Sequence, residues 1–257
     1  MLLAIDTSTH YASLALADGD VLLAELNWRV GQRHGSELLE RARWLLREQS
    51  AAMSELTAVA VALGPGSFNG VRVAVATAKT LAFALGVPLY GAPTLDVIAW
   101  GARLAAEPIW ALLDAGRGEV YAARYDSASS QPIWAPQTDA DDGASEPYCI
   151  TTPQALAERI RASVVFTGEW RDATRDTLAS ALGERARFTS PMATRRGAWL
   201  AELAAQRAHH GADDDPRALE PLYLRRPNIT KSARSMSTPT AARMTDRADG
   251  EEVTHAL

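Results

Sequence analysis

The sequence predicts an α/β protein whose second half repeats the plan of its first half. Residues 58–63 form a short apolar run without charge, which is typical of a strand buried on both faces. Residues 71–85 hold no Pro or Gly and are rich in alanine, so they should form a helix. An apolar strand that ends in an acid and a tight polar turn occurs twice, at Asp6 and at Asp114.

The first half is expected to be a three-strand meander followed by parallel crossover units. Residues 2–5, 11–17 and 21–28 should be strands, with a tight turn at Asp18-Gly19. Ser36 should cap a helix that ends at Glu48 and carries a leucine stripe. After the central strand and helix, Gly86-Val87-Pro88 should end the helix and residues 89–91 should form a short strand. Thr94 should then cap a helix to about Ala105.

The second half is expected to begin with strands at 110–116 and 119–125, where Asp114 matches Asp6 and Gly116 matches Ser8. Residues 131–146 are polar and should form a solvated loop. Further elements are expected as a helix from Thr152-Pro153, a strand at 163–167, helices at 172–182 and 196–210, and an extended segment at 220–225. From Lys231 on, the composition predicts a disordered tail.

Composition excludes several classes of protein. The chain has 257 residues, is 47% hydrophobic and 22% charged, and has a formal net charge of −5, so no global basic field would hold nucleic acid. Its single cysteine, Cys149, rules out an internal disulfide and a multi-cysteine metal site. The opening lacks a basic region and meets an acid at Asp6, so it should be a strand rather than a signal peptide. No run reaches the length of a membrane span, and a cytoplasmic protein is expected.

The glycine loop Gly64-Pro65-Gly66-Ser67 lies between the central strand and the long helix. Such a loop can point bare N–H groups and a positive dipole end at an anion. It matches neither the Walker A loop nor the dinucleotide fingerprint, because no Lys follows and Asn69 stands where a Gly is needed. Arg72 in the first helical turn is disfavoured without an acid or anion nearby. Two interpretations remain open: an anion site, or a tight structural turn with Arg72 paired to an internal acid.

Six segments of the chain form one recognisable pattern: Ala4-Ile5-Asp6-Thr7-Ser8, Gly64 to Arg72, Ala76 to Ala82, Thr94-Leu95-Asp96, Asp114 to Tyr121 and Glu220-Pro221-Leu222-Tyr223-Leu224-Arg225. Taken together, these segments resemble the TsaB (YeaZ) family, the accessory subunit of bacterial tRNA threonylcarbamoyladenosine biosynthesis. They span residues 4 to 225 in the family's order. Asn69, where the family usually has Thr, and the variant His34-Gly35-Ser36 depart from its pattern.

The resemblance implies a duplicated actin/hexokinase-like (ASKHA) fold with two lobes, each a mixed β-sheet flanked by helices. The lobes are expected at 1–105 and 106–195, with 196–230 packing back on the first lobe and 231–257 as the tail. It also implies a non-catalytic subunit that binds a catalytic paralogue, TsaD, and an ATPase, TsaE. The assembly transfers a threonylcarbamoyl group to the adenosine beside the anticodon of tRNAs, and tRNA would be met through the complex. The rival hypotheses are an independent small-molecule kinase, which needs an adenosine loop that is not visible, and a peptidase, which lacks a recognisable metal or nucleophile set.

Neither catalytic nor metal-binding residues are predicted, since no two histidines have the helical spacing of the paralogue's metal pair. No cofactor is required by the chain alone, although ATP or ADP could bind at the boundary with the partner. The predicted phosphate or nucleotide residues are Asp6, Thr7, Ser8, Gly64, Gly66, Ser67, Arg72, Asp114 and Gly116. The alternative for the two acids is that each accepts N–H groups of its own turn. Gly168-Glu169 is the nearest candidate for an adenosine loop, and Lys79 should lie on an exposed face or in an internal ion pair.

Two helices could supply an interface, because their small or leucine-rich stripes would allow close helix packing. The predicted interface residues are Leu38, Leu39, Ala42, Leu45, Leu46, Ala74, Ala78 and Ala82. The alternative is that both stripes cover the protein's own sheet, and sequence cannot choose between the two faces. Without its partner, such a surface would favour a homodimer.

Overall fold

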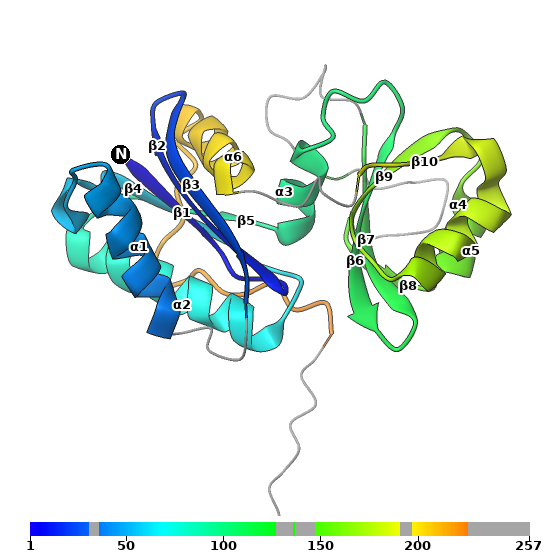
Figure 1. Ribbon diagram of the computed structural model, residues 1–257, viewed down its shortest axis with the longest axis horizontal. Helices are drawn as coiled ribbons and strands as arrows, with labels where there is room; N and C mark the ends of the chain where they lie inside the picture. Colours follow the sequence, from blue (N-terminus) through cyan, green and yellow to red (C-terminus); the bar gives the residue numbers. More distant parts are fainter. Residues whose placement is uncertain (31–35, 127–135, 137–146, 191–196, 226–257) are drawn as a thin grey trace, which may run out of the picture. The chain divides into compact units, whose positions relative to one another are not determined.

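The computed structural model describes residues 1–30, 36–126, 136, 147–190 and 197–225, which lie within the compact unit Met1–Arg226. It contains two five-stranded mixed sheets (Figure 1). The predicted tail and, apart from Pro136, the predicted loop at 131–146 lie outside the described residues.

The first sheet has the strand order β3-β2-β1-β4-β5. Its strands are β1 (Leu2–Asp6), β2 (Tyr11–Asp18), β3 (Val21–Arg29), β4 (Ala58–Ala62) and β5 (Leu89–Ala92). The first strand pairs antiparallel with β2 and parallel with β4, which makes it the centre of the sheet. Because successive side chains alternate between faces, Leu3 and Ile5 enter one core while Ala4 enters another.

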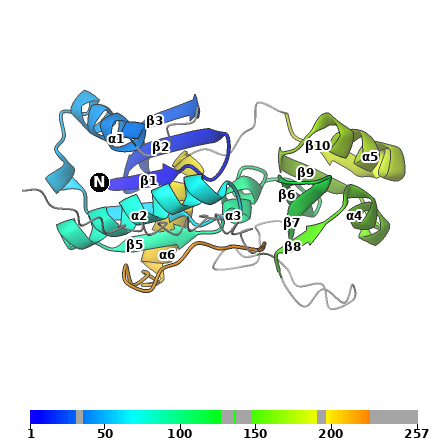
Figure 2. The same ribbon diagram turned by 90° about the horizontal axis from the view of Figure 1, so that it is seen from below.

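Helices cover both faces of this sheet. The helices α1 (Ser36–Glu48) and α2 (Phe68–Leu85) share one core with Leu3 and Ile5. The helix α6 (Gly197–His209) covers the opposite face, where Gly197 allows close approach because a Cβ there would lie 2.9 Å from that of Ala15. Figure 2 shows α2 and α6 flanking the first sheet.

The second sheet repeats this plan with the order β10-β9-β6-β7-β8. Its strands are β6 (Ile109–Gly116), β7 (Glu119–Tyr125), β8 (Cys149–Thr151), β9 (Val164–Glu169) and β10 (Ala186–Phe188). As in the first sheet, the opening strand pairs antiparallel with the next one and parallel with the fourth. The helices α4 (Pro153–Arg159) and α5 (Asp172–Leu182) pack on one face. The predicted duplication and the predicted fold class are confirmed.

The helix α3 (Thr94–Trp100) belongs by sequence to the first half but packs against the second sheet, on β6, β7 and β9. The helix α6 belongs by sequence to the second half and packs against the first sheet. Their apolar residues share one core that also contains Ala4 and Ala111, from the central strands of the two sheets. The two halves are therefore joined by exchanged helices and a common core.

Several predicted boundaries were wrong for physical reasons. The long helix starts at Phe68, three residues before the apolar run at 71–85. Of the two caps that the sequence offers, Asn69 and Ser67, the structure uses Ser67, which accepts the Gly70 N–H at 3.3 Å. Thr94 is not a cap; Pro93 precedes the helix, and the Thr94 hydroxyl instead accepts the Gly64 N–H at 3.1 Å. That helix ends at Trp100 rather than near Ala105.

Two strands that the sequence pattern does not predict are β8 and β10, each three residues long. Such strands are too short for an alternation of polar and apolar residues to stand out. Among the described helices, none has the length and apolar character needed to cross a membrane.

Candidate functional site

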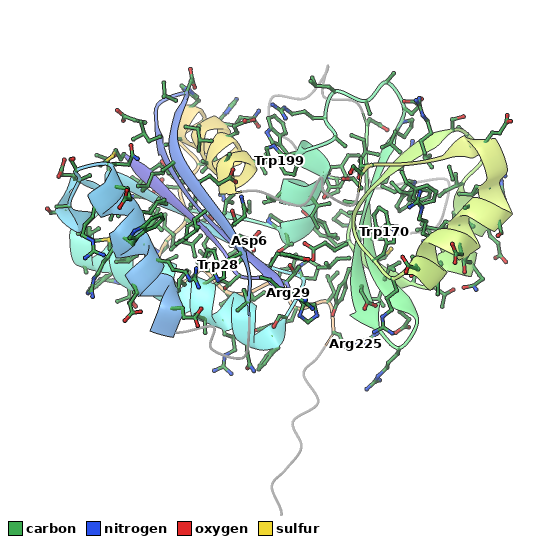
Figure 3. The ribbon with its side chains drawn as sticks, viewed as in Figure 1. Asp6, Trp28, Arg29, Trp170, Trp199 and Arg225 are labelled. Atoms are coloured by element: carbon green, nitrogen blue, oxygen red, sulfur yellow. The ribbon has the colours of Figure 1, made fainter. Side chains whose placement is uncertain are left out.

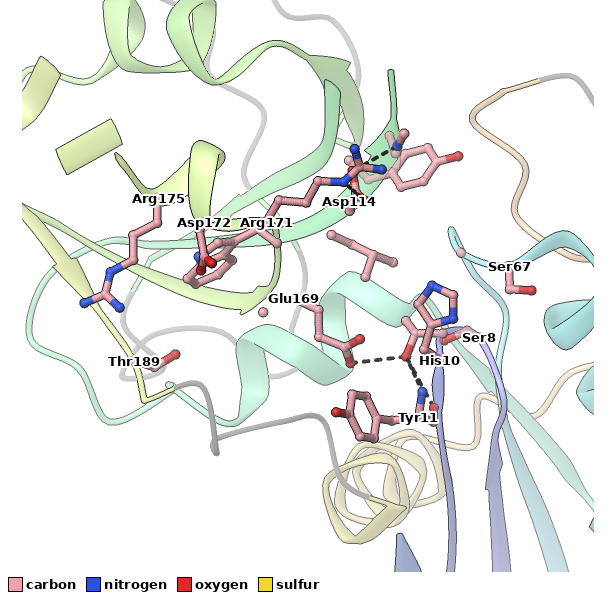
Figure 4. Close-up of a pocket in the computed structure, with 18 residues that line it drawn as sticks. Ser8, His10, Tyr11, Ser67, Asp114, Glu169, Arg171, Asp172, Arg175 and Thr189 are labelled. Carbon is pink, nitrogen blue, oxygen red and sulfur yellow. Dashed lines mark hydrogen bonds and ion pairs between the residues drawn. The ribbon is translucent and has the colours of Figure 1, made fainter. Parts of the chain in front are cut away.

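A cavity of about 680 Å³ lies where the first turns of both sheets meet the glycine loop (Figure 4). The first half lines it with Ser8, Thr9, His10, Tyr11, Gly66 and Ser67. The second half contributes Leu113, Asp114, Ala115, Gly116, Tyr121, Gly168, Glu169, Trp170, Arg171, Asp172, Arg175 and Thr189. Five of the nine predicted nucleotide residues therefore line one cavity: Ser8, Gly66, Ser67, Asp114 and Gly116.

Asp6 lies at the end of β1 and is fully buried (Figure 3). Its Oδ1 accepts the Ser8 backbone N–H at 2.9 Å and the Ser8 hydroxyl at 2.7 Å. Next to it, the Thr7 hydroxyl donates to the Gly70 carbonyl at 2.6 Å. Asp6 and Thr7 therefore support the turn from beneath and are absent from the cavity lining.

Asp114 occupies the equivalent place in the second sheet. Its Oδ1 accepts the Gly116 backbone N–H at 3.0 Å, and its Oδ2 accepts the Arg171 Nε–H at 2.8 Å. The Asp114 side chain is 34% exposed, so the carboxylate reaches the cavity but already has a guanidinium partner. Asp6 and Asp114 therefore each accept an N–H group of their own turn, as the alternative interpretation of these two acids expected.

The glycine loop is a packed structural turn. The Ser67 N–H donates to the Ser8 carbonyl at 2.7 Å, and the Gly70 N–H is taken by the Ser67 hydroxyl. A Cβ at Gly66 would lie 2.0 Å from the Ser8 carbonyl oxygen, so only glycine fits this contact. Gly64 has φ +95° and faces the Leu222 carbonyl instead of the cavity. Two N–H groups that an anion would need are therefore already bonded within the protein.

Among the residues that the structure describes, the partner of Arg72 is an aromatic ring and not the internal acid that one of the two interpretations expected. The Arg72 guanidinium carbon lies 5.1 Å from the centroid of the exposed Phe68 ring, a cation–π arrangement. Lys79 has a backbone partner, since its Nζ donates to the Leu219 carbonyl at 2.8 Å, and no acid in the described part of the chain forms an ion pair with it. Arg72 and Lys79 therefore contact Phe68 and Leu219, and neither of them lines the cavity.

Several residues that the sequence pattern does not indicate shape the wall of the cavity formed by the second half. Glu169 accepts a hydrogen bond from the Thr9 hydroxyl at 3.2 Å, so this contact crosses the cavity between the two halves (Figure 4). Gly168 and Glu169, the nearest candidate for an adenosine loop, are the last two residues of β9, and a Cβ at Gly168 would lie 1.9 Å from the Leu112 carbonyl oxygen. Arg171 directly precedes α5, and matching β4 with β9 in the repeat could have pointed to this position.

The wall formed by the second half combines aromatic rings with cations. Trp170 and Tyr121 line the cavity beside Arg171 and Arg175, at the beginning of α5. Arg175 lies over the Phe188 ring at 5.2 Å, so its position is supported by packing. Rings and guanidinium groups together suit an anionic aromatic molecule. Within the described ranges, no three His, Cys, Asp or Glu side chains are grouped as metal ligands.

The helical stripe that was predicted to form an interface is mostly buried inside the protein, so its side chains are not exposed to a partner. Seven of its eight residues are at most 3% exposed and form the core beneath α1 and α2: Leu38, Ala42, Leu45, Leu46, Ala74, Ala78 and Ala82. Only Leu39 is exposed, at 36%. An apolar stripe marks the face that a helix buries, and here that face covers the protein's own sheet.

The duplicated sheets, the exchanged helices and the cavity between equivalent turns define a protein of the actin/hexokinase-like class. A family model described as "TsaD: tRNA N6-adenosine threonylcarbamoyltransferase" matches residues 29–231. The solved structure "YeaZ from Pseudomonas aeruginosa" superposes with a TM-score of 0.70 at 26% identity, over 87% of this chain and 99% of that one.

Two curated relatives of the chain share one description. The "tRNA threonylcarbamoyladenosine biosynthesis protein TsaB" of Escherichia coli is 30% identical over 171 residues, which are 66% of this chain and 68% of the relative. The protein of the same description from Bacillus subtilis is 36% identical over 124 residues, and the match spans about half of its length (54%) and 48% of this chain. The chain belongs to the TsaB (YeaZ) family.

Proposed function

We propose that the chain is a non-catalytic accessory subunit in tRNA threonylcarbamoyladenosine biosynthesis and acts by binding a catalytic paralogue of the TsaD type. In this proposal a TsaE-like ATPase joins the same assembly, and tRNA is met through the complex. The family relatives carry the biosynthetic part of the proposal, since two of them are described as TsaB proteins of this process.

The non-catalytic role is supported by how the acids of the cavity are used. Asp6 is buried and bonded to Ser8, and Asp114 is bonded to Gly116 and Arg171. A general base has to reach a proton of the substrate by a hydrogen bond. Ser67 likewise caps its own helix through Oγ. These side chains stabilise turns, and this is the observation on which the non-catalytic proposal rests.

The docking surface that we propose is the outer face of α2, together with the exposed part of α1. Between Val73 and Leu85 the only charged residue is Lys79, whose ammonium group is bonded to Leu219. On α2 the exposed residues between 73 and 85 are small or apolar: Ala76, Thr80, Phe83 and Ala84. The exposed part of α1 contributes Leu39 and Trp44 and is otherwise charged, with Glu40, Arg43, Arg47 and Glu48. Depletion of charge and enrichment in aromatic rings are features of interface cores. Phe83 is 69% exposed and is therefore a candidate anchor.

The experiment that tests this proposal is titration of the chain with the TsaD-type paralogue of the same organism, followed by calorimetry. We expect a complex with the unmodified chain and a loss of affinity of at least about tenfold with Ala76→Glu, because a buried unpaired charge is costly. Ala179→Glu on the exposed side of α5 is the matched control and should bind normally.

The possible outcomes distinguish a wrong docking face from a wrong accessory role. Normal binding by Ala76→Glu would mean that α2 does not dock the partner. Absence of binding by the unmodified chain, in a mixture that also contains the ATPase and nucleotide, would contradict the accessory role itself. A self-associated chain that Ala76→Glu converts to a monomer would indicate that a second copy occupies the same face.

We further propose that a nucleotide binds on the wall of the cavity formed by the second half. The support is the placement of Trp170, Arg171 and Arg175 around one opening. The first-half loop has already used the N–H groups of Ser67 and Gly70. Calorimetry with ADP should show weaker binding for Arg175→Ala than for the unmodified chain, and the same affinity for both would argue against this wall.

A further inference from the structure

The segment Leu219–Arg225 connects the two walls of the cavity. Its first part is bonded to the first half of the chain, since the Leu222 N–H donates to the Leu63 carbonyl at 2.8 Å and Lys79 donates to the Leu219 carbonyl. The Tyr223 ring lies 5.2 Å from the Phe68 ring, which begins α2. Three contacts therefore fix this part beside the glycine loop and the long helix.

The end of the segment is bonded to the second half. Arg225 lies at the turn between β6 and β7 (Figure 3). Its Nη1 donates to the Ala115 carbonyl at 3.1 Å, and its Nη2 forms an ion pair with Glu119. Ala115 and Gly116 line the cavity opposite Gly66 and Ser67. The segment thus links the backbone before Gly66 on one wall to the backbone before Gly116 on the other.

The two anchors differ in strength. The first includes a backbone hydrogen bond in a tightly packed place, where a Cβ at Gly64 would lie 2.9 Å from the Leu222 carbonyl oxygen. The second depends on the side chains of Arg225 and Glu119, which are 30% and 35% exposed. Partly exposed ion pairs contribute little to stability and open readily. The Arg225 end is therefore the one that can release while the rest of the segment stays in place.

We propose that the segment is a latch: Arg225 holds the β6–β7 turn against the first half and thereby sets the opening of the cavity. The same segment is bonded to α2 through Lys79, and its Tyr223 packs on Phe68. A protein that binds on α2 would therefore change how readily the Arg225 contacts open. This second part rests on the proposed function, because it needs a partner that docks on α2. Coupling of this kind requires that the segment has two arrangements, one with Arg225 bonded and one with it released. The partner on α2 and the cavity must then differ in which arrangement they favour.

Hydrogen exchange of the chain alone tests the latch. We expect Arg225→Ala to speed exchange of the amides at 114–121 by about five- to tenfold, because one weak anchor is lost. The amide of Leu222 should stay protected. Arg217→Ala is the matched control, since it removes an exposed arginine from the preceding turn. Glu119→Gln should reproduce the effect in part, and it serves as the test if Arg225→Ala does not fold. Equal exchange in the variant that folds and in the control would overturn the latch.

The second comparison adds the TsaD-type partner. Partner binding should change exchange at 114–121 in the unmodified chain and leave it unaltered in Arg225→Ala. An equal change in both proteins would overturn the coupling. Absence of binding to the unmodified chain would overturn the proposed function, and the exchange of the chain alone would then still decide the latch.

Discussion

Asp6 and Asp114 make the same hydrogen bond at the same place in two copies of one motif. Each carboxylate accepts, on Oδ1, the backbone N–H of the residue two positions later, at 2.9 Å for Ser8 and 3.0 Å for Gly116. The two copies differ in exposure, because Asp6 is fully buried while the Asp114 side chain is 34% exposed and bonded to Arg171. The Asp6 carboxylate is therefore enclosed by the protein, whereas the Asp114 carboxylate faces the cavity.

This difference predicts unequal effects on stability. Asp6→Ala should lower the free energy of unfolding by about 3 kcal/mol, because two donors of Ser8 lose their acceptor in a dry environment. Asp114→Ala should cost about 1 kcal/mol, since water can replace a partly exposed carboxylate. Denaturant unfolding measures both values. Asp6→Asn keeps an acceptor and should be milder than Asp6→Ala, and equal losses at positions 6 and 114 would contradict this account.

The close contact of Gly70 with the first turn gives a second prediction. A Cβ at this position would lie 2.0 Å from the Thr7 carbonyl oxygen, and both groups belong to packed backbone. Gly70→Ala should therefore cost at least about 3 kcal/mol or prevent folding. Gly86, which ends the same helix with φ +66°, has no atom within 4 Å of such a Cβ. Gly86→Ala should cost only about 1–2 kcal/mol in chemical denaturation, and a similar cost for both would refute the steric argument.

The sequence predicts those features of the fold that depend on residues close together in the chain, and not those that depend on residues far apart in it. The long helix, the central strand and the repeat around Asp6 and Asp114 follow from local patterns of apolar residues, and all are present. The bond between Asp114 and Arg171 joins residues 57 positions apart, so no local pattern indicates it. The same holds for Thr94, whose hydroxyl bonds Gly64 instead of capping its own helix.

The interface prediction shows a different limit. A helical stripe such as Ala74 and Ala78 identifies the face that is buried, but it does not say what buries it. In this fold the sheet does so, and a docking surface has to be sought among residues that are uncharged and exposed, such as Ala76 and Phe83. Sequence alone could not separate the two faces, because small residues occur on both sides of α2.

Two tryptophan substitutions on α2 separate these faces. Ala78 is fully buried, so Ala78→Trp should overpack the core and lower the melting temperature strongly, if the chain folds at all. Ala76 is exposed, and Ala76→Trp should change the free energy of unfolding by no more than about 0.5 kcal/mol. Thermal melts followed by circular dichroism check both. A stable, folded Ala78→Trp protein would show that this face is not packed as described.

The last prediction concerns a buried acid in the shared core. Asp96 of α3 accepts hydrogen bonds from the Tyr125 and Tyr148 hydroxyls, each at 2.7 Å and each on Oδ1. Burial raises the pKa of Asp96 from 3.8 to about 7, and the two hydroxyl groups oppose this rise. Because the folded protein holds the proton more tightly than the unfolded chain, this group's contribution to stability is complete below pH 3.8 and is lost as the pH rises to about 7.

The wild-type chain should therefore lose stability relative to Asp96→Asn as the pH rises through this window. One unit of pKa corresponds to about 1.4 kcal/mol, so urea unfolding at about pH 5 and about pH 8 should give a relative loss of about 2–3 kcal/mol. The asparagine keeps an oxygen for the tyrosines but cannot ionise, which makes it the matched control. Because other carboxylates titrate alike in both proteins, the difference between the two curves isolates Asp96. Parallel curves would mean that Asp96 is already ionised throughout the window and that the core around Tyr125 tolerates its charge.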